Sequence, residues 1–233
     1  MIVCSSAMRA GLIGVGGMVA LSIVPASAVS LVTNGDFSGG NSGFFSDYTS
    51  NAPISDHAQY TVVPAANIND LTSNVYGDWG AVTTDPSGGN GNVLIADGAT
   101  SSNERVWYQT VSGVQANTLY TFNFYAVDVN NDRVIDASIQ ASVLGVGIGT
   151  LNTNGGWQLG SFNWNSGANS GPIILALIDT NTAGPFNDFG IDQISFSAST
   201  PLPAALPLFA SGLGVMGFLA RRRKRKSAAE IAA

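Results

Sequence analysis

The sequence predicts an all-β protein: a jelly-roll β-sandwich over residues 29–199, preceded by a signal peptide and followed by one C-terminal transmembrane helix. Three observations lead to this prediction. From Val29 onward, short strand-like runs alternate with segments rich in Gly, Asn, Asp and Ser, and no long apolar stripe recurs with the helical period. Both ends of the chain are apolar and carry most of its cations. The stretch between them is long enough for one domain.

Residues 1–28 have the pattern of a secretory signal peptide. Arg9 precedes the apolar run Ala10 to Val24, and Pro25-Ala26-Ser27-Ala28 supplies an Ala-x-Ala cleavage site. We expect cleavage after Ala28, and an uncleaved anchor is the alternative. Cys4 is the only cysteine and lies in this segment, so the mature domain has neither a disulfide nor a thiol.

Strands are expected where β-branched and aromatic residues gather between turn signals. In Leu119 to Val129, the aromatic residues Tyr120, Phe122 and Phe124 alternate with polar ones, which predicts a strand with one buried face. A domain of about 170 residues buries close to 70% of its unfolded surface, so no disulfide is needed. The expected strands are Leu94 to Ala96, Val106 to Val111, Leu119 to Val129, Val134 to Leu144, Trp157 to Trp164, Ile173 to Ile178 and Phe189 to Phe196.

The charge of the predicted domain narrows the classes of partner. Between Val29 and Thr200 there are thirteen aspartates and Glu104, against Arg105 and Arg133, which gives a formal charge of about −12. Nucleic acid is excluded as a partner, because binding it requires clustered cations. Divalent cations and uncharged sugars are compatible with such a surface.

Calcium is the cofactor to consider, because it takes six to eight oxygen ligands. The first and last strands of a sandwich lie side by side, so Asn34 and Asp36 could meet Asp192; the alternative is that these residues cap turns. A second set, in a loop with some EF-hand spacing, is Asp128, Asn130, Asp132 and Asp136, but Arg133 stands where that loop needs glycine. An ordinary hairpin loop explains the second set equally well.

Sugar binding needs a flat aromatic face surrounded by polar groups. The candidates are Trp79, Tyr108 and Trp157, and we expect Trp79 to be the best exposed, because it lies in a glycine-containing loop. Trp107 and Trp164 lie in strand-like runs and are expected in the core. No catalytic residues are predicted, since His57 is the only histidine and no Gly-x-Ser-x-Gly motif is present. Two carboxylates would be enough for a glycosidase, but none lies in a motif.

The C-terminal segment, residues 200–226, has three parts. Pro201, Leu202, Pro203 and Ala204 open it, an apolar run extends to Ala220, and six consecutive cations close it. Leu202 to Ala220 is 19 residues, about the length of a membrane-spanning helix. The basic end is expected to stay in the cytoplasm with residues 227–233; a buried helix with a solvated basic tail is the alternative. The cations are Arg221, Arg222, Arg223, Lys224, Arg225 and Lys226.

This order of motif, helix and basic cluster resembles the sorting signal of PEP-CTERM proteins of the Val-Pro-Leu-Pro-Ala type, with Thr200 where the family has valine. The resemblance implies that an exosortase-type enzyme recognises the motif at the inner membrane. It also implies that the protein goes to the cell surface or extracellular matrix of a Gram-negative bacterium that makes exopolysaccharide.

A second resemblance covers Leu31 to Ser197. Asn34-Gly35-Asp36-Phe37, the run Val106 to Val111 and the closing segment Asn187 to Phe196 are similar to carbohydrate-binding modules with the galactose-binding-like fold, with Ser38 where that family usually has glutamate. The resemblance implies a sandwich of eight to ten strands that often holds one calcium ion and binds glycans through aromatic residues. A non-catalytic module for extracellular polysaccharide is therefore the leading hypothesis; a self-associating, calcium-dependent matrix or surface-layer protein and a glycan hydrolase are the alternatives.

Overall fold

The structure is a computed structural model that describes residues 28–70, 79, 82–130, 137–153, 155–182, 187–199 and 216. The predicted signal peptide up to residue 27, the motif at residues 201–204 and the basic cluster at residues 221–226 lie outside the described residues. Within the described part of the chain, no helix is long and apolar enough to span a membrane.

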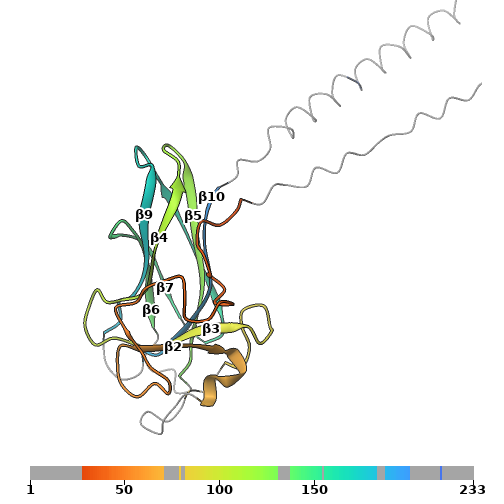
Figure 1. The fold of residues 1–233 in the computed structure, drawn as a ribbon, viewed down its shortest axis with the longest axis vertical. Coiled ribbons are helices and arrows are strands. Elements are labelled where there is room, and N and C mark those ends of the chain that lie inside the picture. Colours follow the sequence, from red (N-terminus) through yellow and green to blue (C-terminus); the bar gives the residue numbers. More distant parts are fainter. Residues whose placement is uncertain are drawn as a thin grey trace, which may run out of the picture.

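The described chain is all-β and forms two sheets that face each other (Figure 1). The larger sheet has the strand order β1-β2-β3-β10-β5-β8, and the smaller has the order β4-β9-β6-β7. All pairings are antiparallel except that of β1 with β2. The elements are β1 Thr49–Ser50, β2 Gln59–Pro64, the 3₁₀ helix η1 Ala65–Asp70, β3 Asn92–Asp97, β4 Arg105–Val114, β5 Leu119–Asp128, β6 Ser138–Val143, β7 Val146–Asn152, β8 Gln158–Asn165, β9 Gly171–Asp179 and β10 Phe189–Ala198.

Each of the seven expected strands overlaps an observed one, and three observed strands were not expected. Of these, β7 is the longest, and its sequence contains little of the usual strand signal, because Gly147 and Gly149 alternate along it. Neighbouring side chains occupy the space that side chains there would take: Gln140 lies over Gly147, and the ring of Phe162 lies over Gly149. The strand is therefore specified by its neighbours.

The hairpin loop that was the alternative explanation of the second calcium set is wrong. Strand β5 pairs with β10 and β8 in the larger sheet, whereas β6 pairs with β7 and β9 in the smaller one. The two strands therefore belong to different sheets. The mistake arose because two strands adjacent in sequence usually pair, and nothing in the local pattern reports a change of sheet.

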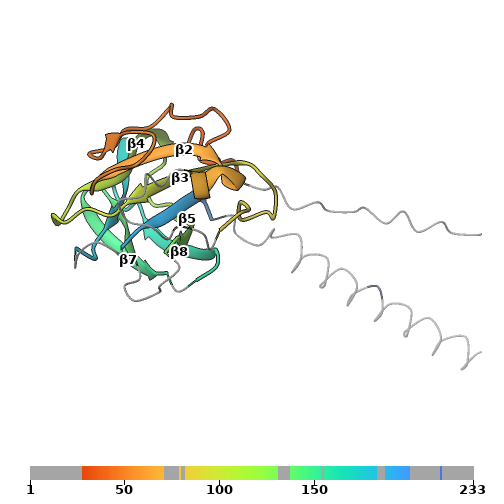
Figure 2. The same ribbon diagram turned by 90° about the horizontal axis from the view of Figure 1, so that it is seen from below.

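Aromatic residues fill the space between the two sheets. Tyr120, Phe122 and Phe124 of β5 are buried, as their alternation predicts, and Phe196 of β10 stacks on Tyr120 with ring centroids 4.8 Å apart. Trp107 faces them from the smaller sheet, with its ring 6.4 Å from that of Phe122. Figure 2 shows the strands of the domain from below.

A second, smaller cluster covers the outer face of the larger sheet. Val93 and Ile95 of β3 point outward into it, while Leu94 and Ala96 point into the main core. This explains why β3 is buried on both faces. The cover includes the helix η1 with Ala65 and Ile68, as well as the aromatic residues Trp79 and Trp157.

The N-terminal segment runs beside β10, as expected of the first and last parts of a sandwich. The amide of Leu31 donates to the carbonyl of Phe196 at 2.8 Å, and the amide of Ile194 donates to the carbonyl of Gly35 at 2.8 Å. A side chain on Gly35 would collide with the backbone of Ile194. The segment lacks strand geometry, but its position brings Asp36 close to Asp192.

Candidate functional site

The outer face of the smaller sheet, the face turned away from the core, carries the candidate site. Ala176 in the middle of β9 pairs with Tyr108 of β4 on one side and with Ser142 of β6 on the other. Directly paired residues point to the same face of a sheet, so these three side chains lie in one row. Ile178 pairs in the same way with Arg105. A continuous surface thus extends across three strands.

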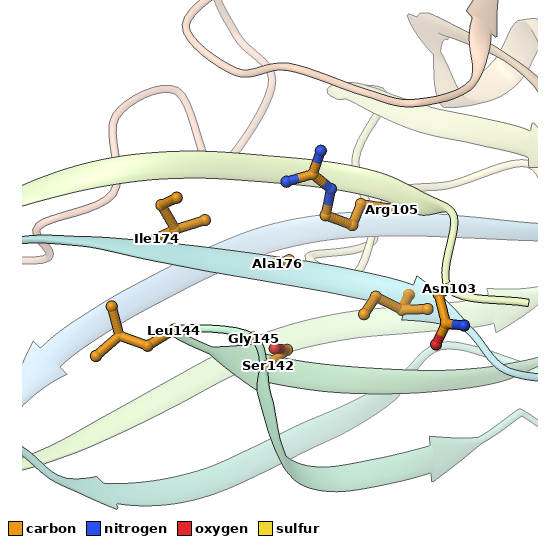
Figure 3. Close-up of a pocket in the computed structure, with 8 residues that line it drawn as sticks. Asn103, Arg105, Ser142, Leu144, Gly145, Ile174 and Ala176 are labelled. Atoms are coloured by element: carbon orange, nitrogen blue, oxygen red, sulfur yellow. The ribbon is translucent and has the colours of Figure 1, made fainter.

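This surface is hollowed into a groove of about 480 Å³. Known ligand pockets have volumes of roughly 300–1,000 Å³. Figure 3 shows Leu144 and Ile174 at one end of the groove and Asn103 and Arg105 at the other. The eight residues that line it are Asn103, Arg105, Ser142, Leu144, Gly145, Ile174, Ala176 and Ile178.

A stack of three side chains adjoins the groove at β4. The guanidinium carbon of Arg105 lies 3.6 Å from the centre of the Tyr108 ring, and the ring of Phe45 stacks on Tyr108 with centroids 5.6 Å apart. The backbones of Phe45 and Tyr108 also hydrogen-bond to each other in both directions. Phe45 is 65% exposed, so the stack presents an aromatic surface to solvent.

Asp47 neutralises the positive charge of Arg105. The Nε of Arg105 donates to Oδ2 of Asp47 and its Nη2 donates to Oδ1, both at 2.8 Å. The guanidinium lowers the pKa of Asp47, chiefly through these hydrogen bonds, so the pair stays ionised together. Since Arg105 is the only charged residue that lines the groove, this surface has little net charge.

The three predicted glycan-binding residues do not come together. Tyr108 lies beside the groove, whereas Trp79 and Trp157 belong to the cover on the other sheet. The expectation that Trp79 is well exposed is wrong: it is 7% exposed, and its Nε1 donates to Oδ2 of Asp188 at 2.7 Å. Trp157 is partly buried and donates from Nε1 to the carbonyl of Thr84. The core positions expected of Trp107 and Trp164 are confirmed for Trp107, and Trp164 packs partly buried against the core.

The first predicted calcium set is only partly assembled. Asp36 and Asp192 are near enough that the charge of Asp36 helps to raise the pKa of Asp192 to about 7, after burial and the charge of Asp85. Asn34 is occupied elsewhere: its Oδ1 accepts from the amide of Gly39, and its Nδ2 donates to two carbonyl groups of the same loop. Asn34 thus stabilises a turn, which was the alternative considered for these residues.

The second predicted calcium set is described only in part. Oδ1 of Asp128 accepts from the amide of Asn130, and both residues are buried, while Asp132 and Asp136 lie outside the described residues. Across the residues that are described, no group of three or more His, Cys, Asp or Glu is arranged to hold a metal ion. Calcium therefore stays a prediction.

A cluster of buried carboxyl groups occupies one end of the sandwich. Nδ1 of His57 lies 2.8 Å from Oδ1 of Asp97, and burial raises the pKa of Asp97. Burial, helped by the charge of Asp97, raises the pKa of Asp188 to about 8. Asp179 belongs to the same end, where Nδ2 of Asn187 donates to its Oδ2 at 2.7 Å. These groups are internal and support the strand ends.

Sequence reasoning predicted Tyr108 beside the groove but missed Phe45 and all eight residues that line the groove, among them Leu144 and Ile174. Phe45 and Leu144 lie outside the strands, and Ile174 reads as one more apolar strand residue. Only strand pairing shows that they gather on one face. The dipeptide Leu144-Gly145 between two strand-like runs was the one local signal that could have indicated a turn there.

No protein-family model and no curated protein sequence matches the chain. Among solved structures, the CBM22-1 xylan-binding domain of Xyn10C from Paenibacillus barcinonensis is similar, with 13% identity, 76% of this chain and 98% of that chain covered, and a TM-score of 0.46. TmCBM61 in complex with beta-1,4-galactotriose has 16% identity, coverage of 74% and 100%, and a TM-score of 0.45. The enzymatically active domain of tailspike protein 4 from bacteriophage CBA120 has 11% identity, coverage of 73% and 21%, and a TM-score of 0.40. With similarity this low, the function is inferred from this chain's own residues.

Proposed function

We propose that the protein is an exported surface protein whose jelly-roll domain binds uncharged extracellular polysaccharide without cleaving it. The sugar chain lies in the groove on the smaller sheet and against the exposed ring of Phe45 and the partly exposed ring of Tyr108. An exosortase-type enzyme processes the C-terminal segment at the inner membrane, and the domain remains at the cell surface or in the extracellular matrix. A structural calcium ion is part of this proposal only through the sequence resemblance.

The observation that carries the proposal is the combination of a neutral groove with an aromatic stack at its edge. A pyranose ring offers patches of C–H groups, which pack on aromatic faces, and hydroxyl groups, which need polar partners. The Tyr108 and Phe45 rings supply the faces, while Asn103 and Ser142 supply polar groups within the groove. Arg105 holds the Tyr108 ring from one side and is itself neutralised by Asp47.

The lining of the groove favours binding over hydrolysis. A glycosidase needs two carboxyl groups that flank the bond to be cleaved. The eight residues that line the groove include neither Asp nor Glu. The chain can therefore hold a glycan there, but the groove itself offers no acid–base pair.

A glycan array probed with residues 29–199 tests the proposal, since this range contains both sheets and their cores. We expect binding to at least one neutral polysaccharide, weakened about two- to tenfold by Tyr108→Ala and by Phe45→Ala, because contacts with an aromatic ring typically contribute roughly 0.5–1.5 kcal/mol. Leu159→Ala is the matched control, because Leu159 is exposed on β8 of the other sheet. Absence of all glycan binding, with and without calcium, would refute the proposal.

A further inference from the structure

The turn between β6 and β7 contains an unexpected residue. Val143 pairs with Val146, so the connection is the two-residue loop Leu144-Gly145. Its φ angles are +54° and +77°. Positive φ at both central residues defines the type I′ turn, whose first position prefers Asn, Asp or Gly. A bulky side chain with positive φ is a genuine outlier.

The side chain of Leu144 gains only partial burial in compensation for this conformation. It is 46% exposed and lines the groove beside Ile174, which is 42% exposed. The amide of Leu144 donates to the carbonyl of Ile174 at 2.9 Å, so the two residues are fixed side by side. The chain thus places two apolar side chains in solvent at one end of the groove (Figure 3).

The groove between them and Arg105 is mainly aliphatic. Ala176 and Ile178 continue the apolar surface, and Ser142, which is 2% exposed, contributes a hydroxyl to the lining. Flat sugar faces pack best on aromatic rings, which here lie outside the groove at Tyr108 and Phe45. A mainly aliphatic groove matches instead a projecting methyl group, whose burial is favourable without any flat partner.

We propose that this groove selects sugars that carry a methyl group, either as an O-acetyl ester or as the C6 methyl of a 6-deoxy sugar, and that Leu144 and Ile174 make the contact. The inference rests on the proposed function and names the ligand class of the same site. Uncharged ligands are favoured because the groove's one charged residue is already paired with Asp47. The proposed contact with the ligand accounts for leucine at position 144, where asparagine would suit the backbone better.

Three neutral polymers serve as probes of the full chain. The first is an O-acetylated glucomannan, the second is the same glucomannan after mild alkaline removal of its acetyl esters, and the third is a rhamnan, which carries 6-deoxy methyl groups. Dissociation constants are measured by affinity electrophoresis. We expect at least one methyl-bearing polymer to bind about fourfold or more tightly than the deacetylated glucomannan, the factor that one buried methyl group provides. Comparison of the first and third polymers shows which source of methyl group is accepted.

Leu144→Asn is the decisive variant, because it introduces a side chain that suits the turn and removes the apolar side chain that would contact the ligand. We expect it to fold with an equal or higher Tm, since asparagine favours the type I′ turn, yet to lose the preference for methyl-bearing polymers. Leu159→Asn is the matched control, as Leu159 is 51% exposed on the other sheet, and it should keep the preference. An unchanged preference in Leu144→Asn would overturn the role of Leu144.

The outcomes also separate this inference from the function on which it rests. Equal binding of acetylated and deacetylated glucomannan, together with no binding of rhamnan, would overturn the selection of methyl groups and leave polysaccharide binding intact. If the protein bound only sugars without methyl groups on the glycan array, the selection of methyl groups would likewise be overturned and polysaccharide binding would stand. If neither the array nor the three polymers give any binding, the proposed function and this inference fail together.

Discussion

Buried carboxyl groups dominate the chemistry of this domain at the scale of single residues. Asp179 and Asp188 are almost fully buried, and desolvation raises their pKa values to about 7 and about 8. Asp85 shows the opposite behaviour: hydrogen bonds from Ser87, Gly89 and Gly91 lower its pKa to about 2. The same side-chain type is thus held protonated at one end of the sandwich and ionised in a loop.

These shifts predict that stability falls as pH rises from about 4 to about 8. In this range, folded Asp179 and Asp188 keep protons that the unfolded chain, with a carboxyl pKa of 3.8, has already lost. Because the folded state binds more protons, the free energy of unfolding decreases with pH, by up to about 1.4 kcal/mol per pH unit for each proton. Urea unfolding at several pH values checks this, and a gain in stability between pH 5 and pH 8 would contradict it.

The variant Asp188→Asn removes one of these two titrating carboxyl groups and so tests its share of the pH dependence. The amide oxygen can still accept from Trp79, whose Nε1 donates to Asp188 in the native chain, but the side chain no longer titrates. We expect a flatter pH dependence between pH 5 and pH 8 in this variant. Asp85→Asn is a suitable control, because the low pKa of Asp85 adds stability that is lost only as pH falls from 3.8 toward about 2.

Calcium binding is a second prediction at the scale of residues. If the ion binds near Asp36 and Asp192, calcium should raise Tm in the full chain, and Asp192→Asn should abolish that rise, because the ion stabilises only the state that binds it. Asp56→Asn serves as control, since Asp56 is exposed and bonds only locally to the amide of His57. A Tm that does not respond to millimolar calcium would remove the metal from the proposal.

At the scale of elements, strand β7 depends on the side chains of its neighbours. A Cβ on Gly149 would lie 2.0 Å from the Cδ1 atom of Phe162, which belongs to β8 in the other sheet. The absence of a side chain lets the two sheets approach each other at this edge. The alternation of residues in the sequence could not predict β7, because the side chains that pack over its glycines come from other strands.

Gly149→Ala should therefore destabilise the fold by about 1–3 kcal/mol, the usual effect of overpacking a well-filled interior. Gly156→Ala is the matched control, since a Cβ at Gly156 has no atom within 4 Å and should be nearly neutral. Denaturant unfolding of both variants measures the difference. Equal stabilities of the two variants would show that Phe162 moves aside without cost.

At the scale of the whole molecule, the first and last described parts of the domain lie side by side along β10. Leu31 bonds to Phe196, and the amide of Ser199 donates to the carbonyl of Leu119 at the start of β5. In Figure 1 the coloured chain begins and ends at the same end of the sandwich. Cutting the chain at both ends would therefore leave the sheets and the groove intact.

This arrangement suits the N-terminal cleavage that the sequence predicts and the C-terminal processing that we propose. We expect the mature protein to begin at Val29 and to have lost the basic cluster through cleavage near residues 201–204. Intact-mass spectrometry of the protein from the surface of an exosortase-containing host measures both ends. A mass that includes residues 1–28 would contradict the signal peptide, and one that includes residues 221–226 would contradict C-terminal cleavage.

The amino-acid sequence alone determined the class of fold, the inward face of β5 and the positions of seven strands, because these follow from local alternation of apolar and polar residues. The tertiary structure decided which strands share a sheet, and therefore where the site lies. Trp79 was expected on the surface and is buried against Asp188, while no local pattern placed Leu144 in the groove or Phe45 beside it on Tyr108. The physical reason is that exposure and neighbourhood on a sheet depend on pairing between distant segments, and no local pattern records that pairing.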